Sequence, residues 1–269
     1  MFSAGHILFL IISAAVITAG ILYCVKKRPP LKKVLYVCLA LGLLSEFIKI
    51  LYLTQIVPVV EPVVENGALI YKETGSFTPY LEAEHLPFEL CSYQILFIFL
   101  AIIIKDRKWL KPLHAMMYPT CIIGALMALF LTFETHDVDG IMGFLGSINI
   151  WRTFLYHSML IVLGVYIGIS GECDLRFRDF KWAVILVALL DFGSFYLNSI
   201  MSTPYYQGDT LVGVGNAVNY FSSYNNPLSI VMPDKRSWFV YLAIRFALAF
   251  TLMLLFYLPL LKKDRKDAK

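Results

Sequence analysis

The chain has 269 residues, of which 59% are hydrophobic and 16% charged, and its formal net charge is +4 at pH 7. Ordinary soluble domains are about 45–50% apolar and about 25% charged. A soluble chain of this length could not hide so much apolar surface from water, whereas a lipid bilayer accepts it. The composition therefore argues against a soluble enzyme and predicts a multi-pass protein of the cell membrane, with one domain over residues 1–269.

Seven apolar blocks follow one another along the chain, and their lengths are near the roughly 20 residues that a membrane-spanning helix needs. They cover residues 5–25, 34–57, 87–104, 113–133, 152–170, 182–201 and 237–260. Because lipid offers no hydrogen-bond partners to the backbone, each block is expected to be an α-helix. Continuous apolar runs argue against a barrel. We therefore predict an all-α, polytopic membrane protein with seven transmembrane helices.

The first block is expected to stay as a helix rather than be cleaved as a signal peptide, because basic residues follow it and none precedes it. Basic residues gather in the segments 26–33, 105–111 and 176–181 and in the tail 262–269, which together hold 17 of the 23 Lys and Arg residues. The positive-inside rule then places the N-terminus outside and the C-terminus in the cytoplasm. Since this topology accounts for the basic residues, no nucleic-acid partner is expected.

The segments predicted to lie outside differ in composition. Residues 58–86 are acidic, and residues 202–236 are rich in Gly, Asn, Ser and Tyr, including Asn216, Tyr224, Asn225 and Asn226. Loops of this length are either lids and binding surfaces or solvated linkers. The apolar stretch 141–150 either lies at the membrane interface or extends the fifth helix. The five cysteines are odd in number and none lies in an outer loop, so no disulfide framework is expected.

Ionisable side chains inside the predicted spans are the most informative feature, because burying a charge in hydrocarbon costs about 2.5–3.5 kcal/mol even on lenient scales. With about 1.5 Å of rise per residue, they converge in the outer half of the bundle. Asn198 shares a helix face with one of them, Asp191. Two interpretations remain open: a polar cavity open to the outer leaflet, or a charge-paired core that only locks helices together. The residues are Glu46, Lys49, Glu89, Arg152, His157, Asp191 and Arg245.

No metal and no cofactor is expected. Only His157 among the five histidines is deep in a span, so a catalytic three-histidine zinc site cannot form there. A mixed site using His157, Asp191, Glu46 and Glu89 remains an alternative. A retinal Schiff base would need a deep lysine in the last helix, where Arg245 stands instead, and arginine cannot take that role.

A cysteine nucleophile with a histidine base is the remaining chemistry. Cys91 and His157 are expected at comparable depth, and a nucleophilic thiol needs a base within hydrogen-bond reach. Arg152 or Arg245 could supply positive charge to an oxyanion. The alternative is that Cys91 is a small buried residue and His157 a hydrogen-bonded core histidine.

Three segments resemble the YwaF family of bacterial integral membrane proteins, and the resemblance runs over most of the chain. They are His-Leu-Pro-Phe-Glu-Leu-Cys at residues 85–91, Trp151-Arg152 to His157, and Asn219-Tyr220 followed by Asn226-Pro227. The family pattern in the third span reads Leu-Pro-Leu-His-Leu-Cys, so Glu89 stands where a histidine is usual.

YwaF proteins are distantly similar to a eukaryotic phospholipid acyltransferase that moves a polyunsaturated acyl chain onto a lyso ether lipid, using a cysteine in this motif and a downstream histidine. The resemblance implies Cys91 as the acyl-carrying nucleophile and His157 as its base. We expect an acyltransferase or lipid hydrolase at the outer leaflet, with membrane phospholipid as donor and lysolipid or water as acceptor. The alternatives are a receptor or carrier for a polar or lipid ligand and a structural membrane component. The residues expected to bind substrate or form a charge network are Glu46, Lys49, Glu89, Arg152, Asp191, Asn198 and Arg245.

Overall fold

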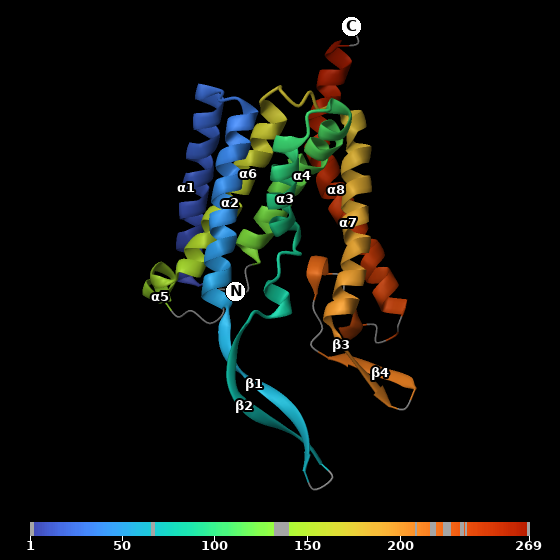
Figure 1. Cartoon of the computed structure of the whole chain (residues 1–269). Coiled ribbons are helices and arrows are strands. Elements are labelled where there is room, and N and C mark those ends of the chain that lie inside the picture. Colours follow the sequence, from blue (N-terminus) through green and yellow to red (C-terminus); the bar gives the residue numbers. More distant parts are fainter. Residues whose placement is uncertain are drawn as a thin grey trace.

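The structure is a computed structural model that describes residues 3–65, 68–131, 140–207, 209–215, 219–222, 227–231, 234 and 236–267. The predictions made for residues 132–133 and for Asn216, Tyr224, Asn225 and Asn226 lie outside these ranges. Figure 1 shows a bundle of long helices, with two β-hairpins projecting from one end and the C-terminus at the other. We call these the hairpin end and the tail end.

The first two helices are separated by local backbone chemistry. Helix α1 (Ala4–Lys27) begins where the Ser3 side chain accepts the backbone N–H of His6, which satisfies an otherwise orphaned donor. It ends at Arg28, whose φ of 45° is left-handed, and Pro29 and Pro30 then prevent a continuous helix. Helix α2 (Leu31–Leu53) follows immediately and runs back toward the hairpin end.

The remaining helices follow the predicted order, with one short addition. Six helices of the described chain are long and apolar enough to span a membrane, namely α1, α2, α4, α6, α7 and α8. Helix α3 has only 14 residues, about 21 Å, so the expectation of a seventh full-length span at 87–104 is not met. The helices are α3 (Leu90–Ile103), α4 (Arg107–Phe130), α5 (Gly140–Gly146), α6 (Ile148–Ile169), α7 (Phe180–Met201) and α8 (Arg236–Asp267).

The apolar stretch 141–150 is divided between two helices. Most of it forms the short helix α5, and residues 148–150 already belong to α6. Ser147 separates the two helices and caps α6, because its hydroxyl accepts the backbone N–H of Ile150. Residues 148–150 therefore extend the fifth predicted span toward the hairpin end, while the interfacial position expected for the rest of the stretch stays a prediction.

Two antiparallel hairpins correct the all-α prediction. β1 (Gln55–Glu65) pairs with β2 (Ala68–Tyr80), and β3 (Thr203–Gln207) pairs with β4 (Thr210–Gly215). Residues 55–57, expected at the end of the second helix, are the start of β1 instead. Valine and isoleucine make this segment as apolar as a helix end, but β-branched residues suit extended backbone, and Pro58 disfavours helix in the residue before it.

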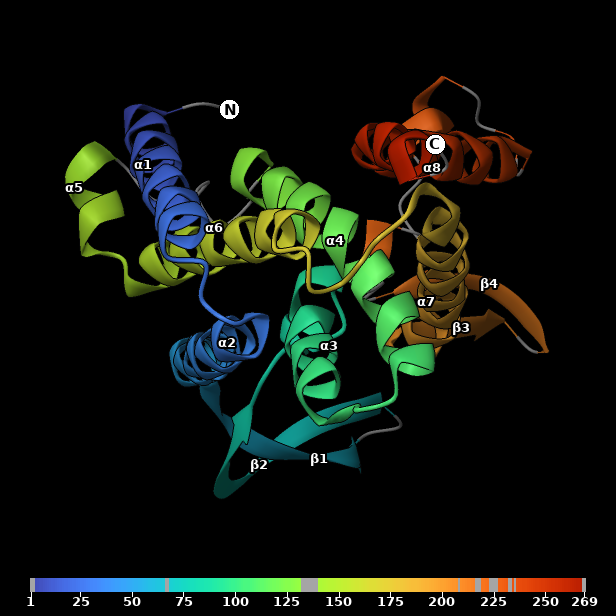
Figure 2. The same cartoon turned by 90° about the horizontal axis from the view of Figure 1, so that it is seen from above.

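Helices α4 and α6 lie at the centre of the bundle, with α1, α2 and α5 beside α6 and α7 and α8 on the far side of α4 (Figure 2). Helix α6 packs against α1, α2 and α4, and α4 also contacts α3, α7 and α8. Over their apolar stretches α4 and α6 are 61% buried and α8 only 6%, so α4 and α6 form the core and α8 is peripheral. The connections that carry the basic clusters lie at the tail end (Figure 1).

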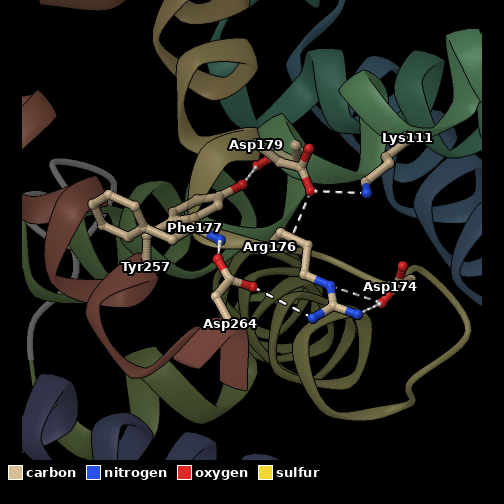
Figure 3. A network of polar contacts seen from close by, with 8 residues as sticks. Lys111, Asp174, Arg176, Phe177, Asp179, Tyr257 and Asp264 are labelled. Carbon is tan, nitrogen blue, oxygen red and sulfur yellow. Dashed lines mark hydrogen bonds and ion pairs between the residues drawn. The ribbon is translucent and has the colours of Figure 1, made fainter. Parts of the chain in front are cut away.

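A polar network ties the peripheral helix α8 to the bundle at the tail end, as Figure 3 shows. Asp179 Oδ2 lies 3.1 Å from Lys111 Nζ and accepts the backbone N–H of Arg176 at 2.8 Å. The Arg176 guanidinium contacts Asp264 of α8 at 3.4 Å, and Asp264 Oδ2 also accepts the backbone N–H of Phe177 at 3.1 Å. These contacts join α4, the α6–α7 loop and the end of α8.

Close contact between α4 and α6 depends on glycine. A Cβ added at Gly164 would lie 2.7 Å from the Ile122 side chain and 3.0 Å from both Cys121 Cβ and the Tyr118 carbonyl oxygen. Backbone cannot move aside as a flexible side chain can. Gly193 of α7 offers the opposite case, since a Cβ there would meet nothing within 4 Å.

We therefore predict that Gly164→Ala destabilises the protein by about 1–3 kcal/mol, because the added methyl group overpacks the α4–α6 contact. Gly193→Ala is the matched control and should be neutral or stabilising by up to about 1 kcal/mol, since alanine favours the helix. Thermal unfolding in detergent, followed by circular dichroism, compares the two. An equal or higher melting temperature for Gly164→Ala would contradict the packing argument.

Candidate functional site

A short 3-10 turn, Tyr220–Ser222, enters the hairpin end of the bundle, and Phe221 within it has non-helical dihedral angles. Tyr220 is 1% exposed, and Asn198 of α7 holds its backbone in both directions. The Asn198 Oδ1 atom accepts the Tyr220 N–H at 2.9 Å, and Asn198 Nδ2 donates to the Tyr220 carbonyl at 3.2 Å. The Tyr220 hydroxyl donates to the Ala83 carbonyl. One amide side chain therefore replaces the partners that a helix would have supplied to this segment.

Arg245 of α8 joins the same segment to α7. Its Nη2 atom donates to both carboxylate oxygens of Asp191, at 2.6 and 2.5 Å, and its Nη1 atom donates to the carbonyl of Phe221. Phe221 has a φ of 58°, a left-handed conformation that is uncommon for an aromatic residue and needs such support. Asp191 and Arg245 are only 6% and 17% exposed at their side chains, so the pair lies inside the bundle.

Glu89 connects this arrangement to α2 and α3. Its carboxylate accepts the backbone N–H of Phe221 at 3.5 Å, a long contact, and it lies within electrostatic reach of Lys49. Lys49 in turn is 2.5 Å from Glu46, one turn away on α2. Asn198 of α7, Arg245 of α8 and Glu89 at the N-cap of α3 therefore meet around Tyr220 and Phe221, and the Glu46–Lys49 pair of α2 reaches this group only through Glu89.

The sequence left open whether the ionisable residues line a polar cavity or form a charge-paired core, and these contacts bear on that question. Two pairs, Glu46–Lys49 and Asp191–Arg245, are the ion pairs expected of a charge-locked core. The segment beside the Asp191–Arg245 pair was not expected to enter the bundle. The long segment 202–236 thus contributes the buried Tyr220 and the half-buried Phe221 instead of only a solvated linker.

Cys91 lies in the first turn of α3, between α4 and α6. The Tyr156 hydroxyl donates to the Cys91 carbonyl at 2.7 Å, which fastens the start of α3 to α6. A Cβ built at Gly124 of α4 would lie 3.5 Å from the Cys91 sulfur, so the thiol rests directly on the α4 backbone. Sequence reasoning missed Tyr156, whose only signal was its position immediately before His157.

His157 is held by its own helix. Its Nδ1 lies 2.7 Å from the carbonyl oxygen of Thr153, and because a carbonyl can only accept, Nδ1 carries the proton. In the neutral ring, Nε2 then carries the lone pair that a base requires. Within the ranges that the structure covers, no hydrogen bond joins the Cys91 thiol to His157. Tyr156, which bonds the Cys91 carbonyl, lies between them in contact terms, since its ring centroid is 5.4 Å from that of His157.

Arg152 stands apart from the other charged residues. Its Nε and Nη2 atoms donate to Asn149 Oδ1 at 2.9 and 2.7 Å, and Nη2 also donates to the Thr153 hydroxyl at 3.0 Å. Asn149 lies three residues earlier on α6, so the guanidinium is held along its own helix. The side chain borders a groove between α2 and α6.

The alternative mixed metal site is not formed. Among the residues with described placement, no group of three or more His, Cys, Asp and Glu side chains could hold a metal ion. Glu46 faces Lys49, Asp191 faces Arg245 and His157 faces the Thr153 carbonyl, so the four proposed ligands do not converge on one point.

The fold defines a multi-pass helical membrane protein whose polar side chains gather at one end of the bundle. The TMEM164 family model matches residues 1–258, and the chain belongs to the TMEM164 family. The match supports the expected kinship with a eukaryotic ether-lipid acyltransferase family, and it does not test the resemblance to the bacterial YwaF family. No curated protein and no solved structure matches the chain.

Removal of one partner from the buried ion pair should be costly. We predict that Asp191→Ala destabilises the protein by about 3–5 kcal/mol, because it leaves the Arg245 charge buried with its carboxylate partner gone. The exposed pair Glu65–Lys72, at 2.9 Å, provides the control, and Glu65→Ala should change stability by at most about 1 kcal/mol.

The double variant Asp191→Ala with Arg245→Met should recover part of that loss, since it leaves no unpaired charge. Thermal unfolding of the four proteins in detergent measures these differences. Equal shifts for Asp191→Ala and Glu65→Ala would show that the Asp191–Arg245 pair does not hold the bundle together.

Proposed function

We propose that this protein is a lipid acyltransferase in which Cys91 is the nucleophile and His157 its base. The proposal is supported by membership of TMEM164, a family of membrane lipid-modifying acyltransferase proteins. The observation that carries the assignment to these residues is the Tyr156–Cys91 hydrogen bond, which fixes the thiol-bearing turn of α3 beside the turn of α6 that carries His157. The donor is a membrane phospholipid and the acceptor a lysolipid, with water as the acceptor in hydrolysis.

The first half-reaction forms an acyl-enzyme. His157 Nε2 takes the Cys91 thiol proton, and the thiolate attacks the carbonyl carbon of a lipid ester. The new S–C bond forms as the ester C–O bond breaks, and the departing alkoxide takes the proton from the imidazolium. A lysophospholipid leaves, and the acyl chain remains on Cys91 as a thioester.

The second half-reaction returns the enzyme to its starting state. His157 removes the proton from the acceptor hydroxyl, whose oxygen attacks the thioester carbonyl. An O–C bond forms, the S–C bond breaks, and the thiolate recovers its proton from His157. The proton count is unchanged over the cycle and no atom changes its oxidation state, so no external oxidant or reductant is required.

The environment of the two residues gives each a defined part in this proposal. The Thr153 carbonyl selects the tautomer that leaves the lone pair on Nε2. The Tyr156 hydroxyl fixes the backbone of Cys91 without occupying its sulfur. The thiol–imidazole contact forms as the lipid enters, since catalytic hydrogen bonds commonly shorten only in the substrate complex. The same proposal places the hairpin end in the outer leaflet, because the basic connections lie at the opposite end.

A receptor or carrier for a polar ligand is a weaker interpretation of the same residues. The polar side chains that could bind such a ligand already form hydrogen bonds with the Tyr220–Phe221 segment or with one another. These residues are Glu89, Asp191, Asn198 and Arg245. A purely structural role would explain these four residues, and it would leave Cys91 and His157 only their packing against α4 and the bond to the Thr153 carbonyl.

Acyl exchange in proteoliposomes tests the mechanism. Cys91→Ala should abolish transfer of a labelled acyl chain from phosphatidylcholine to a lysophospholipid, and His157→Ala should slow it by about 10²–10⁴-fold. Cys38→Ala, which removes a buried thiol of α2, is the matched control and should retain activity. Undiminished transfer by Cys91→Ala, with the protein folded, would refute the proposed nucleophile.

Thiol labelling gives an independent measure with an internal control. Burial, reinforced by the nearby Glu172 carboxylate, raises the pKa of the Cys173 thiol in the α6–α7 loop to about 12. Only roughly one in 10,000 of these thiols is ionised at pH 8, so Cys173 should react very slowly with iodoacetamide. We expect Cys91 to be labelled faster than Cys173 in wild type and to lose that advantage in His157→Ala. Equal rates at both cysteines in wild type would contradict activation of Cys91.

A further inference from the structure

Two lysine–tryptophan pairs stand at equivalent positions at the tail end of the bundle. Lys108 and Trp109 are the second and third residues of α4, and Lys181 and Trp182 are the second and third residues of α7. Lys108 Nζ lies 5.8 Å from the centroid of the Trp109 ring, and Lys181 Nζ lies 5.2 Å from that of Trp182. Each lysine therefore lies over the neighbouring indole in a cation–π contact, which keeps its charge.

The two pairs are neighbours because α4 and α7 pack against each other. Lys111 Nζ of α4 is 3.1 Å from Oδ2 of Asp179, the residue immediately before α7, and Figure 3 shows this ion pair. Lys108 is three residues before Lys111 and shares its helix face. Lys181 follows Asp179 by two residues. The ion pair thus brings the first turn of α4 beside the first turn of α7.

Cations of this region remain available at the surface. Arg107, Lys108, Arg178 and Lys181 are exposed, and none of them forms an ion pair with any residue that the structure describes. Segments 105–111 and 174–181, taken with Asp264, hold seven cationic and four acidic residues. The region is therefore positively charged overall.

The four acids already have partners within the protein. The Asp106 carboxylate accepts the backbone N–H of Lys108 at 2.8 Å and caps α4. The others form ion pairs: Asp179 with Lys111, and Asp174 and Asp264 with Arg176.

The tryptophans indicate where the membrane surface lies. Trp109 and Trp182 are 65% and 37% exposed, and the apolar spans that they belong to begin at Arg107 and Phe177. Tryptophan is enriched at membrane–water interfaces because its ring is apolar and its N–H is polar. The adjoining lysines then lie among lipid headgroups. Helix stability does not explain these lysines, because the helix dipole disfavours cations in a first turn.

We propose that the first turns of α4 and α7 bind the headgroup of an anionic phospholipid in the leaflet at the tail end. Cationic side chains contact the phosphate and carboxylate of the headgroup, and the indoles contact the lipid just below it. The positive-inside rule predicts this leaflet to be the cytoplasmic one, which carries the anionic lipids. We call this site the Lys–Trp surface, formed by Arg107, Lys108, Trp109, Arg178, Lys181 and Trp182.

The chemistry favours a lipid over a soluble anion, because exposed indoles add an apolar contact that only a membrane ligand can use. The Lys–Trp surface also lies at the opposite end of the bundle from Cys91, so the site does not depend on the proposed acyl transfer.

Quenching of tryptophan fluorescence by brominated lipids tests the site. The chain has four tryptophans, and the parent variant Trp151→Phe with Trp238→Phe keeps only those of the Lys–Trp surface as reporters. It is reconstituted in phosphatidylcholine vesicles that contain dibromo-phosphatidylserine or dibromo-phosphatidylcholine at the same mole fraction. We expect stronger quenching by the serine lipid, and a preference that weakens as ionic strength rises.

Neutral lysine variants locate the preference. Lys108→Gln and Lys181→Gln should each lower the relative affinity for the serine lipid about fivefold. Lys26→Gln with Lys27→Gln is the matched control, since it removes two exposed cations from α1, on the other side of the bundle at the same end (Figure 2). This control should keep the preference. In the chain with all its tryptophans, Trp109→Phe with Trp182→Phe should remove the preference, which gives a second measurement.

Equal quenching of the parent by the two lipids would overturn the proposal. An equal loss in the α1 control and in Lys108→Gln with Lys181→Gln would do the same, because the preference would then come from the summed charge of the tail end. Loss of the preference in millimolar inorganic phosphate at constant ionic strength would assign the site to a soluble anion and refute the lipid.

Discussion

Peptide groups that leave helical geometry inside an apolar bundle must find partners, and this requirement organises the hairpin end. The segment before α3 and the Tyr220–Phe221 segment both lie there outside α-helical geometry, each including a short 3-10 turn. Asn198 of α7, Arg245 of α8 and Glu89 at the N-cap of α3 supply polar partners to Tyr220 and Phe221. Such non-helical backbone is tolerated at membrane depth only when protein surrounds it, so the polar side chains in the spans and the buried loop explain one another.

The same requirement explains how a peripheral helix is held. Helix α8 buries little surface, yet Arg245 joins it to α7 and to the loop near the hairpin end, and Asp264 joins it to the α6–α7 loop at the tail end (Figure 3). Between these points, Tyr257 donates to the Ala115 carbonyl of α4 at 2.6 Å. Directional contacts replace extensive packing for this helix, consistent with lipid-exposed helices having no hydrophobic drive to associate.

The sequence predicts the helices well because their signal is local. A run of about 20 apolar residues is long enough to cross the hydrocarbon layer, and only a helix satisfies its backbone hydrogen bonds there. The sequence also predicts that ionisable residues of different spans converge, as Asp191 and Arg245 do, since helix direction and rise per residue fix their depth. The hairpins escape prediction because valine-rich strands are as apolar as helix ends. The burial of Tyr220 and the bond from Tyr156 to Cys91 depend on contacts between residues far apart in the chain, 22 and 65 positions away. The pairing of Cys91 with His157 stays a prediction.

The shortness of α3 has a consequence for the bilayer around it. Leu96, Phe99 and Ile103 are about half exposed, so one face of a helix only about 21 Å long meets lipid whose hydrocarbon layer is about 30 Å thick. This hydrophobic mismatch is relieved when the membrane thins locally, at fractions of a kcal/mol per ångström. Such thinning would draw lipid headgroups toward the first turn of α3, which carries Cys91, and under the proposed function this would shorten the distance between a lipid ester and the thiol.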